Sequence, residues 1–291
     1  MTIPQQYIEY LDRKSSKEVD VVKFGWKDLD DHLAYGGMQK EYTCSLLGKS
    51  GSLKTWFAIC LTRNVIKQGK KVNFFSFEMP YDQLMDRFHQ LIFEKDIDDV
   101  REFVRNNEKF VVDTLIGMHF FERVNIIESP MFLKEIENTI VSCPADLNVI
   151  DYLQLVRVAG RYDDEHENTR SQAMGIFAIK RKLKARFFLL VQLKRSGDKF
   201  GKAGVTAPDL EAGRGSSSIE DSSDMILAGW RPDMDIRNCK DTEKGFIKLL
   251  TIKNRFPSSV SPIVVKLKYN RVTGALTQPG AVESFISDDN F

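Results

Sequence analysis

Short, continuously apolar segments alternate along the chain with longer segments in which apolar residues recur every three or four positions. The first pattern is typical of strands buried on both faces, and the second of helices that bury one face. Strands and helices in this alternating order predict a parallel sheet covered by helices. The expected strands are 42–47, 72–77, 123–127, 147–153 and 187–191, and the expected helices are 56–67, 81–93, 132–141 and 171–184.

The last third of the chain has a different pattern. Shorter strands are expected at 225–228, 246–252 and 263–269, followed by a hairpin-like turn at 270–274. Residues 94–118 are charged and are expected to be helical, with no role assigned to them. The fold class that this order predicts is α/β, with a mainly parallel central sheet flanked by helices.

The first 23 residues are expected to form a separate arm, joined to one large domain at 24–291. Tyr7, Ile8 and Leu11 lie at helical spacing and are followed by a polar run at 14–20, which predicts a short amphipathic helix on a linker. A helix this short is marginally stable in water by itself. It therefore packs on its own domain or on a neighbouring subunit, or it is a frayed terminus.

Composition and charge narrow the class of protein. With 42% hydrophobic and 29% charged residues, the chain of 291 residues is typical of a globular protein, and its net charge of +1 means that any nucleic-acid site must be a local patch. Its four cysteines are scattered, which argues against zinc or disulfides and suits a reducing cytosol. Without a long apolar run or a signal pattern, we expect a cytoplasmic protein with no membrane partner.

A glycine-rich loop joins the first expected strand to the first expected helix. Strand, loop and helix in this order predict a P-loop, whose backbone N–H groups converge on phosphate. Lys54 is then expected to reach the β- and γ-phosphates, and the Thr55 hydroxyl to bind Mg²⁺. An ordinary turn with a chance Lys-Thr pair would have the same local pattern. The expected nucleotide-binding residues are Gly48, Lys49, Ser50, Gly51, Ser52, Leu53, Lys54 and Thr55.

Leu53 departs from the P-loop pattern, which has glycine immediately before the lysine. Gly48 and Gly51 still provide a permissive backbone. Because the phosphate contacts come from backbone N–H groups, which leucine retains, we expect Leu53 to leave nucleotide binding intact. On the sequence alone, replacing Leu53 by glycine is expected to leave binding similar or better.

Three other polar residues stand where expected strands end, namely Glu78, Asp151 and Gln192. Ligands of open parallel sheets bind at the carboxyl ends of the strands, so these residues are expected to face the P-loop. Asp151 is expected to hold Mg²⁺ through its water shell, Glu78 to polarise the attacking water, and Gln192 to sense the γ-phosphate. Singly, each side chain is explained equally well as a helix cap or a loop contact. With the P-loop, they favour a nucleoside triphosphate site.

Six segments resemble motifs of DnaB-type replicative helicases, in the same order and with comparable spacing. They are FGWKDLD at 24–30, FFSFEMP at 74–80, VIDYLQL at 149–155, QLKR at 192–195, SIEDSSD at 218–224 and IKNR at 252–255. The family carries G-F-x-x-L-D, F-x-S-L-E-M-P, a Walker B strand followed by Tyr-Leu-Gln-Leu, Q-L-N-R, S-I-E-Q-D-A-D and I-x-K-N-R at these places. The resemblance covers residues 24–274 and is far more specific than the P-loop alone.

The resemblance implies a RecA-like P-loop NTPase that assembles as a hexameric ring on single-stranded DNA, with ATP and Mg²⁺ bound between subunits. The residues that match the family's cis residues are Lys54, Thr55, Glu78, Asp151 and Gln192. Lys253 and Arg255 match residues that a neighbouring subunit supplies in trans, Arg255 as an arginine finger. Without the resemblance, Arg255 is explained as a surface cation at a strand end.

Two loops, 157–170 and 196–209, are expected to face the pore of the ring. The second loop is basic and rich in glycine, which suits DNA phosphates rather than base edges, although a solvated loop has the same composition. The first loop is acidic at 163–165, which argues against a role of the whole loop in following the DNA backbone. The expected DNA-binding residues are Lys194, Arg195, Lys199 and Lys202.

The chain differs from the family at Leu53, in a longer segment at 210–218 and in lacking the large N-terminal domain of bacterial members, so it resembles a minimal, phage- or mobile-element-type relative. The leading hypothesis is an ATP-dependent 5′-to-3′ replicative DNA helicase, with a primase or a helicase loader as a further partner. The alternatives are a RecA/KaiC-like regulatory or recombination ATPase that does not unwind DNA, and a nucleotide-binding protein with little turnover.

Overall fold

A computed structural model describes residues 4–5, 7–8, 19–160, 165–193, 217–234, 239–258 and 263–280. In this part of the chain a nine-stranded sheet has the order β3-β2-β4-β5-β1-β6-β7-β8-β9. Its strands are β1 (Thr43–Gly48), β2 (Val72–Ser76), β3 (Val124–Glu128), β4 (Leu147–Asp151), β5 (Phe187–Gln192), β6 (Met225–Trp230), β7 (Phe246–Asn254), β8 (Val264–Tyr269) and β9 (Leu276–Thr277).

The sheet is parallel from β3 to β6 and antiparallel from β6 to β9. This arrangement confirms the predicted α/β fold with a mainly parallel central sheet. Strand β1 lies inside the sheet, between β5 and β6, so its backbone is hydrogen-bonded on both sides. The hairpin-like turn expected at 270–274 does join two antiparallel strands, β8 and β9.

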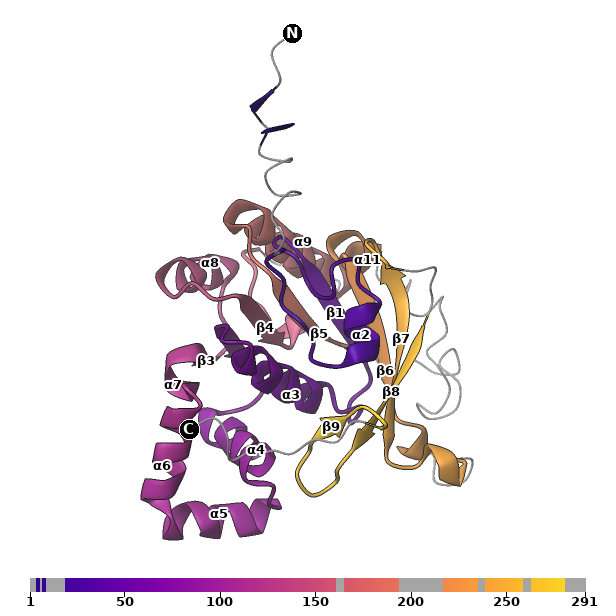
Figure 1. The fold of residues 1–291 in the computed structure, drawn as a ribbon. Helices are drawn as coiled ribbons and strands as arrows, with labels where there is room; N and C mark the ends of the chain where they lie inside the picture. The colour runs from indigo at the N-terminus through magenta and orange to yellow at the C-terminus, as the bar shows by residue number, and fades with distance from the viewer. Residues whose placement is uncertain are drawn as a thin grey trace.

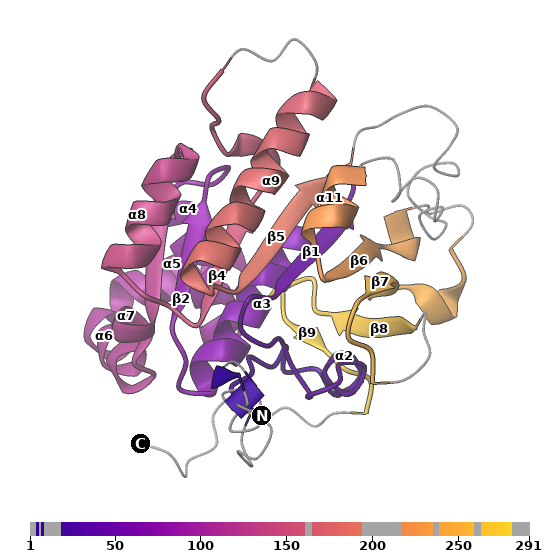
Figure 2. The ribbon, with the colours of Figure 1, turned by 90° about the horizontal axis from the view of Figure 1, so that it is seen from above.

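The helices surround the sheet as two layers (Figures 1 and 2). They are α2 (Lys27–Asp31), α3 (Lys54–Lys67), α4 (Tyr81–Phe93), α5 (Ile97–Asn106), α6 (Glu108–Gly117), α7 (Phe120–Arg123), α8 (Leu133–Ser142), α9 (Glu165–Leu183) and α11 (Ser217–Ser222). Short 3₁₀ turns are η1 (Leu153–Leu155), η3 (Pro232–Met234) and η4 (Asp241–Glu243). The helices at 97–117 confirm the helical structure expected for 94–118.

Strand β5 shows how the continuous apolar runs serve both layers. Phe188 and Leu190 belong to a core cluster that includes residues of α3 and α4, whereas Phe187, Leu189 and Val191 belong to a second cluster with residues of α8 and α9. Alternate side chains of a strand point to opposite faces of a sheet, so each face of β5 has its own core. In Figure 2, α8, α9 and α11 lie in front of the sheet, and α3 lies behind it.

Several boundaries differ from the predicted ones. Helix α9 begins at Glu165 rather than at residue 171, so part of the expected loop 157–170 is helical. Helix α3 begins at Lys54 rather than at residue 56. The predicted starts were wrong because they relied on apolar periodicity, and the first turns of both helices contain polar and charged residues that carry no such signal.

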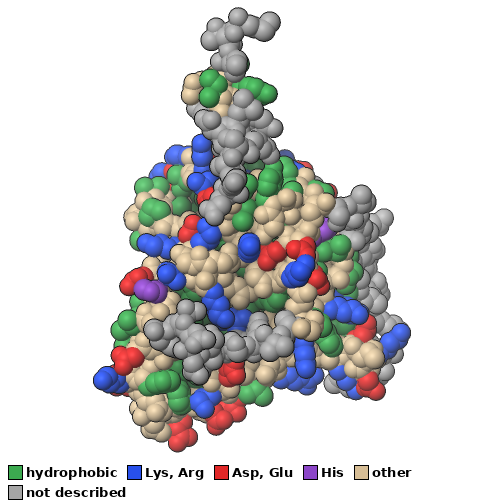
Figure 3. Space-filling view, viewed as in Figure 1, with side chains coloured by type: hydrophobic (Ala, Val, Ile, Leu, Met, Phe, Trp, Pro, Cys, Tyr) green, Lys and Arg blue, Asp and Glu red, His purple; other side chains and the backbone are tan. Residues whose placement is uncertain are grey.

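The surface has no dominant sign of charge on the face shown in Figure 3, where Lys and Arg side chains are interspersed with Asp and Glu among the coloured residues. This distribution agrees with the net charge of +1. Cys44 and Cys60 are free thiols buried in the protein interior. Within the described residues, no helix combines the length and the apolar character needed to span a membrane.

Candidate nucleotide-binding site

The loop after β1 has the geometry of a P-loop. Gly51 has a φ of +79°, and Leu53 has φ +66° and ψ +23°, both in the left-handed region. Lys54, which begins α3, donates hydrogen bonds from its buried Nζ to the backbone carbonyls of Gly48 and Lys49, both at 2.9 Å. These bonds fold the lysine side chain back over the loop, where phosphate would lie.

The loop also contains a buried polar atom that suits a ligand. The Ser52 side chain is 2% exposed, and its hydroxyl has no hydrogen-bond partner among the described residues. Gly48 lies against this hydroxyl so closely that a Cβ at Gly48 would overlap Ser52 Oγ. Because an unsatisfied buried hydroxyl costs free energy, the loop is built to receive hydrogen bonds from outside the chain.

Asp151, the last residue of β4, meets the P-loop helix. The Thr55 hydroxyl donates a hydrogen bond to Asp151 Oδ2 at 2.8 Å. The pKa of Asp151 is raised to about 6, mainly by burial. The nearby Glu78 carboxylate also acts to raise it, whereas the hydrogen bond from Thr55 and the charge of Lys54 act in the opposite direction. Hydroxyl and carboxylate oxygens side by side are the hard ligands that Mg²⁺ prefers.

These two side chains fit a magnesium ion that is held mainly by substrate and water. No group of three or more His, Cys, Asp or Glu residues in the described part of the chain is arranged to hold a metal. Mg²⁺ typically keeps several water ligands and binds through one or two protein oxygens plus substrate phosphates. The pair Thr55 and Asp151 meets that requirement beside the phosphate loop.

Glu78 and Gln192 stand at the same edge of the sheet. Strand β2 pairs with β4, β4 with β5, and β5 with β1, so the carboxyl ends of these strands are contiguous. Glu78 follows β2 and is exposed, and its charge acts on Lys54 and Asp151. Gln192 ends β5 opposite Gly48. The structure therefore brings together the four groups that the sequence placed at strand ends.

A pair of glutamines, which the sequence analysis did not identify, fixes the backbone of Gln192. The Gln154 side chain accepts from Gln192 N at 3.2 Å and donates to Gln192 O at 2.9 Å. Gln172 of α9 in turn donates to the carbonyls of Gln154 and Val156. The bonds to both backbone groups of Gln192 tie the end of β5 to the segment that follows β4.

Lys253 and Arg255 lie at the opposite end of the sheet from the P-loop. Lys253 donates from Nζ to the backbone carbonyl of Glu220, and Arg255 pairs with Asp224 Oδ1 at 2.9 Å. In the sheet, Asn254 is opposite Met225, and Met225 is opposite Cys44, near the start of β1. The structure thus does not bring these two cations to the other expected site residues of the same chain.

The expected DNA-binding residues Lys194, Arg195, Lys199 and Lys202 lie outside the described residues. The same holds for the basic loop 196–209, for the segment 210–216 and for residues 161–164 of the first loop. Leu193, which precedes the basic residues, is bonded through its N–H to the Gly48 carbonyl at 3.1 Å. Leu193, the last described residue before the basic segment, therefore lies beside the P-loop.

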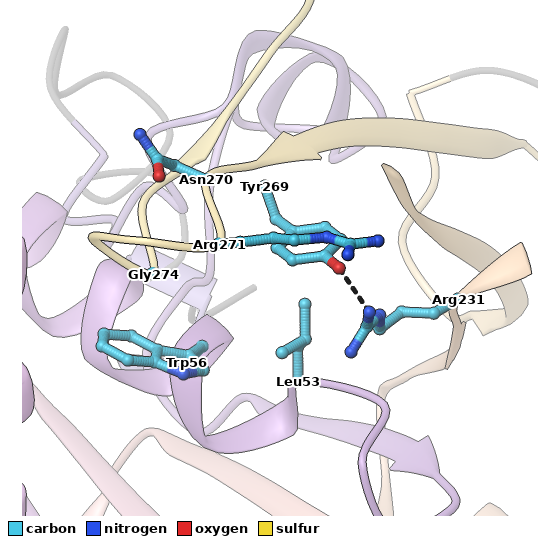
Figure 4. Close-up of a pocket in the computed structure, with 7 residues that line it drawn as sticks. All are labelled: Leu53, Trp56, Arg231, Tyr269, Asn270, Arg271 and Gly274. Atoms are coloured by element: carbon cyan, nitrogen blue, oxygen red, sulfur yellow. Dashed lines mark hydrogen bonds between the residues drawn. The ribbon is translucent and has the colours of Figure 1, made fainter. Parts of the chain in front are cut away.

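A pocket of about 270 Å³ adjoins the P-loop helix (Figure 4). Its lining residues come from the start of α3, from the end of β6 and from the turn between β8 and β9: Leu53, Trp56, Arg231, Tyr269, Asn270, Arg271 and Gly274. A Cβ at Gly274 would overlap the Trp56 ring, so this glycine lets the turn lie directly on α3. The sequence signalled the turn, but no pattern linked it to the P-loop.

One buried carboxylate organises the polar side of this pocket. Asp233 pairs with Arg231 at 3.0 Å and with Arg271 at 2.9 Å, and it accepts a hydrogen bond from the Tyr269 hydroxyl at 3.0 Å. Burial alone would raise the pKa of Asp233, but these partners, Arg231 first, lower it. The Arg231 guanidinium lies 4.5 Å from the centre of the Tyr269 ring and also donates to the Gly51 carbonyl at 3.5 Å. Arg231 therefore links the pocket to the P-loop.

Together, the P-loop at the end of a central strand, the Thr55–Asp151 pair and the doubly covered parallel sheet define a P-loop NTPase domain. Residues 21–273 match the DnaB-like helicase C-terminal domain family, and the chain belongs to that family.

A curated relative agrees with this assignment. The chain is 26% identical over 282 residues to a probable plasmid replicative DNA helicase of Chlamydia psittaci, a match that covers 92% of this chain and 58% of the relative. The chain thus spans less than two thirds of the length of that protein.

Two solved structures have a similar fold. The first is a DnaB-like replicative helicase described with its interactions with primase, at a TM-score of 0.80 and 18% identity over 95% of this chain and 68% of that chain. The second is a KaiC-like protein from Pyrococcus horikoshii OT3, at a TM-score of 0.57 and 15% identity over 90% of this chain and 99% of that chain. Both show the RecA-like fold, and the helicase is the more similar of the two.

Proposed function

We propose that this chain binds and hydrolyses ATP with Mg²⁺, and that it works as a ring-shaped motor that moves along single-stranded DNA and unwinds duplex. The observation that carries the proposal is the meeting of four groups at contiguous strand ends: the P-loop with Lys54, the Thr55–Asp151 pair, Glu78 and Gln192. Family membership supports the helicase part of the proposal.

The roles of the side chains follow from their surroundings. Lys54, now bonded to two carbonyls, can exchange them for the β- and γ-phosphate oxygens. Thr55 and Asp151 would hold Mg²⁺, which neutralises charge on the phosphates. Glu78 is exposed beside them and is the carboxylate placed to accept a proton from the attacking water. Gln192, whose backbone is fixed by Gln154 opposite Gly48, is assigned to sense the γ-phosphate.

The pocket beside the P-loop is assigned to the base and the ribose of the nucleotide. Its volume of about 270 Å³ is just below the range of roughly 300–1,000 Å³ for ligand pockets, which suits a base with its sugar rather than a whole nucleoside triphosphate. Trp56 and Tyr269 contribute aromatic rings to the lining, and Arg231 bonds to the P-loop carbonyl of Gly51. The triphosphate then lies on the P-loop and the base lies between α3 and the β8–β9 turn.

The position of Arg255 supports a site shared between subunits. Gly48 lies four residues further along β1 than Cys44, which is at the level of Arg255, and this is a distance of roughly 13 Å at 3.3 Å per residue. The Arg255 side chain also points to Asp224 rather than along the sheet to the P-loop. An arginine finger from this position would act on the nucleotide of a neighbouring subunit, which suits a closed ring, and we propose a hexamer.

DNA is proposed to bind at the basic segment after β5, with Lys194, Arg195, Lys199 and Lys202 contacting phosphates. The backbone of Gln192 and Leu193 is bonded both to Gln154 and to the P-loop carbonyl of Gly48, so a change at the nucleotide is transmitted to the start of that segment. A primase or a helicase loader is proposed as a further partner.

The alternative is a KaiC-like or recombination ATPase that does not unwind DNA. The lower similarity to the KaiC-like structure does not favour it. ATP hydrolysis with and without single-stranded DNA, together with ATP-dependent strand displacement on a forked DNA substrate, separates these functions. Stimulation by single-stranded DNA and displacement of the strand are expected. ATP hydrolysis without displacement would support the alternative, and nucleotide binding without hydrolysis would overturn both.

Two variants make the test specific to the site. Lys54→Ala should remove most ATP binding and hydrolysis because Lys54 is the lysine whose ammonium group lies over the loop, where it can reach the phosphates. Lys109→Ala is the matched control, since Lys109 is exposed on α6, outside the site. Hydrolysis by Lys54→Ala at the wild-type rate would show that the site is assigned wrongly.

A further inference from the structure

Leu53 occupies a backbone conformation that costs free energy for leucine. Its φ of +66° and ψ of +23° lie in the left-handed region, which glycine adopts without a steric penalty and most other residues avoid. The Leu53 carbonyl accepts the hydrogen bond of Phe57 N at 2.9 Å as α3 begins, so the loop and the helix impose this conformation. Strained residues that persist at a ligand site are a reason to look for a role of the side chain.

The side chain of Leu53 points into the pocket. Figure 4 shows it rising from the start of α3 toward the Tyr269 ring, with Trp56 on one side and Arg231 on the other. Leu53 and Trp56 are partly buried and pack against the core cluster that includes α3. The leucine thus adds an apolar wall at a position where glycine would leave the pocket open.

The location of this wall relative to the P-loop decides which part of a nucleotide it would contact. Arg231 bonds to the Gly51 carbonyl and to the Tyr269 hydroxyl, so the pocket and the P-loop share one border. Leu53 itself is a P-loop residue, with its backbone at the phosphates and its side chain in the pocket. A nucleotide with its phosphates on the loop must pass its ribose and base alongside the Leu53 side chain.

We infer that Leu53 is a specificity-determining residue, an apolar contact for the ribose and base that makes binding depend on the nucleoside and not on the triphosphate alone. The inference rests on the proposed nucleotide site. It changes the expectation drawn from the sequence: replacing Leu53 by glycine relieves backbone strain but removes a contact with the nucleoside. Burial of part of a leucine side chain is worth about a five- to tenfold change in affinity.

The test compares two ligands that share the phosphates and differ in the nucleoside. Binding of Mg²⁺-ATP and of Mg²⁺-tripolyphosphate is measured by calorimetry on the full chain, and the ratio of the two dissociation constants is the readout. Effects on the loop backbone cancel in this ratio. In Leu53→Gly, the preference for ATP over tripolyphosphate should fall about five- to tenfold, and Leu53→Met, which restores apolar bulk, should recover it.

A purely structural role of Leu53 gives a different result. It predicts that Leu53→Gly changes the melting temperature, through relief of strain and loss of packing, and changes both dissociation constants by the same factor. An unchanged ratio, in protein whose ATP binding is abolished by Lys54→Ala, would overturn the role of Leu53 and leave the nucleotide site standing. ATP binding that is insensitive to Lys54→Ala would instead overturn the proposed site, and this inference with it.

Discussion

At the carboxyl end of the parallel strands, charged groups are buried beside neutral partners: Lys54 donates to two backbone carbonyls and Asp151 accepts from the Thr55 hydroxyl. At the amino end, where β7 finishes, the buried Asp224 pairs with Lys180 at 2.8 Å and with Arg255 at 2.9 Å. The charges at the amino end are compensated within the chain. Those at the carboxyl end are still able to bind a charged ligand, which is why the nucleotide is assigned to the carboxyl end.

The contrast between the two ends of the sheet also explains how Arg255 can contact both Asp224 of its own subunit and, in the proposed mechanism, the nucleotide of a neighbouring subunit. Within its own subunit it is held by Asp224, whose side chain is 4% exposed, while 45% of the Arg255 side chain is exposed. Asp224 also accepts from Thr43 N at 2.9 Å, at the start of β1. The carboxylate therefore holds one guanidinium nitrogen of Arg255, while much of the side chain stays exposed for the proposed contact with a neighbouring nucleotide.

The largest effect on activity is expected from replacing Arg255, the exposed partner of Asp224 at the amino end of the parallel strands. If Arg255 acts as the proposed arginine finger, Arg255→Ala should retain ATP binding and lose hydrolysis by about 10³-fold or more. Mixing it with Lys54→Ala by co-expression or by joint refolding creates some interfaces with both halves of the site intact. ATPase activity should partly recover, most strongly near equal amounts of the two variants.

Recovery requires that the two variants share oligomers, so mixed assemblies must be shown directly, for instance by differently tagged subunits. No recovery in such assemblies, or full activity of a monomer at high dilution, would contradict the trans role and the ring mechanism.

The carboxyl end contains two carboxylates with different expected roles. Glu78→Gln keeps the shape and removes the base, so it should bind ATP normally and hydrolyse it about 10²–10⁴-fold more slowly. Asp151→Asn should instead weaken binding that depends on Mg²⁺. Titration of Mg²⁺-ATP and of ATP with a chelator distinguishes these outcomes. Equal loss of affinity in the two variants would show that Glu78 is a ligand or a structural cap.

The ion pair at the amino end is expected to matter for stability. Asp224→Asn leaves the buried Lys180 without a compensating charge and should lower the free energy of unfolding by about 3 kcal/mol. Urea denaturation measures the change. Asp241→Asn, which removes an exposed carboxylate paired with Lys244, is the control and should have no measurable effect. Equal stability of the two variants would mean that Asp224 is not compensating a buried charge.

The smallest effect on stability is expected at Asp30, which lies near the amino end of the strands and is bonded to uncharged backbone groups. Its carboxylate accepts the N–H groups of Phe24 at 2.6 Å and Gly25 at 2.9 Å. Burial nevertheless raises its pKa to about 6, against an ordinary value of 3.8. A carboxyl that is more basic in the folded state favours folding fully below pH 3.8, and this contribution is lost as the pH rises through 6.

Between pH 4 and pH 6.5, the wild-type chain should therefore lose roughly 2–3 kcal/mol more of its free energy of unfolding than Asp30→Asn does. Asp20, whose pKa is lowered to about 2, is present in both proteins, so its contribution to the pH dependence cancels in this comparison. Identical pH slopes in the two proteins would show that the Asp30 carboxylate is ordinarily acidic.

The sequence was informative where one short segment contains the whole signal. The P-loop, and the strands that finish at Glu78, Asp151 and Gln192, could be predicted because each apolar run ends on a polar residue and parallel strands place those ends together. Each strand end can be recognised from a few neighbouring residues, and the parallel pairing of the strands then brings those ends together.

The pocket and the ion pair could not be predicted, for a physical reason. Leu53, Trp56 and Tyr269 meet only because the β8–β9 turn packs on α3, and nothing in the spacing of residues 56 and 269 indicates this contact. Likewise, Lys180 belongs to α9 and Asp224 to the segment before β6, and in the sequence each residue alone has the character of a surface charge. Long-range packing, rather than periodicity, decides these contacts.

The internal position of β1 has a consequence for how the chain is made. Thr43 and Cys44 pair with Phe187 and Met225, residues that leave the ribosome long after β1 does. Until then, a strand that is fully buried in the folded protein has both hydrogen-bonding edges open, which is the condition under which nascent chains aggregate. The strand that carries the P-loop is thus among the last to be fully paired. Synthesis of this chain therefore depends on protecting β1 from aggregation until β5 and β6 have emerged from the ribosome.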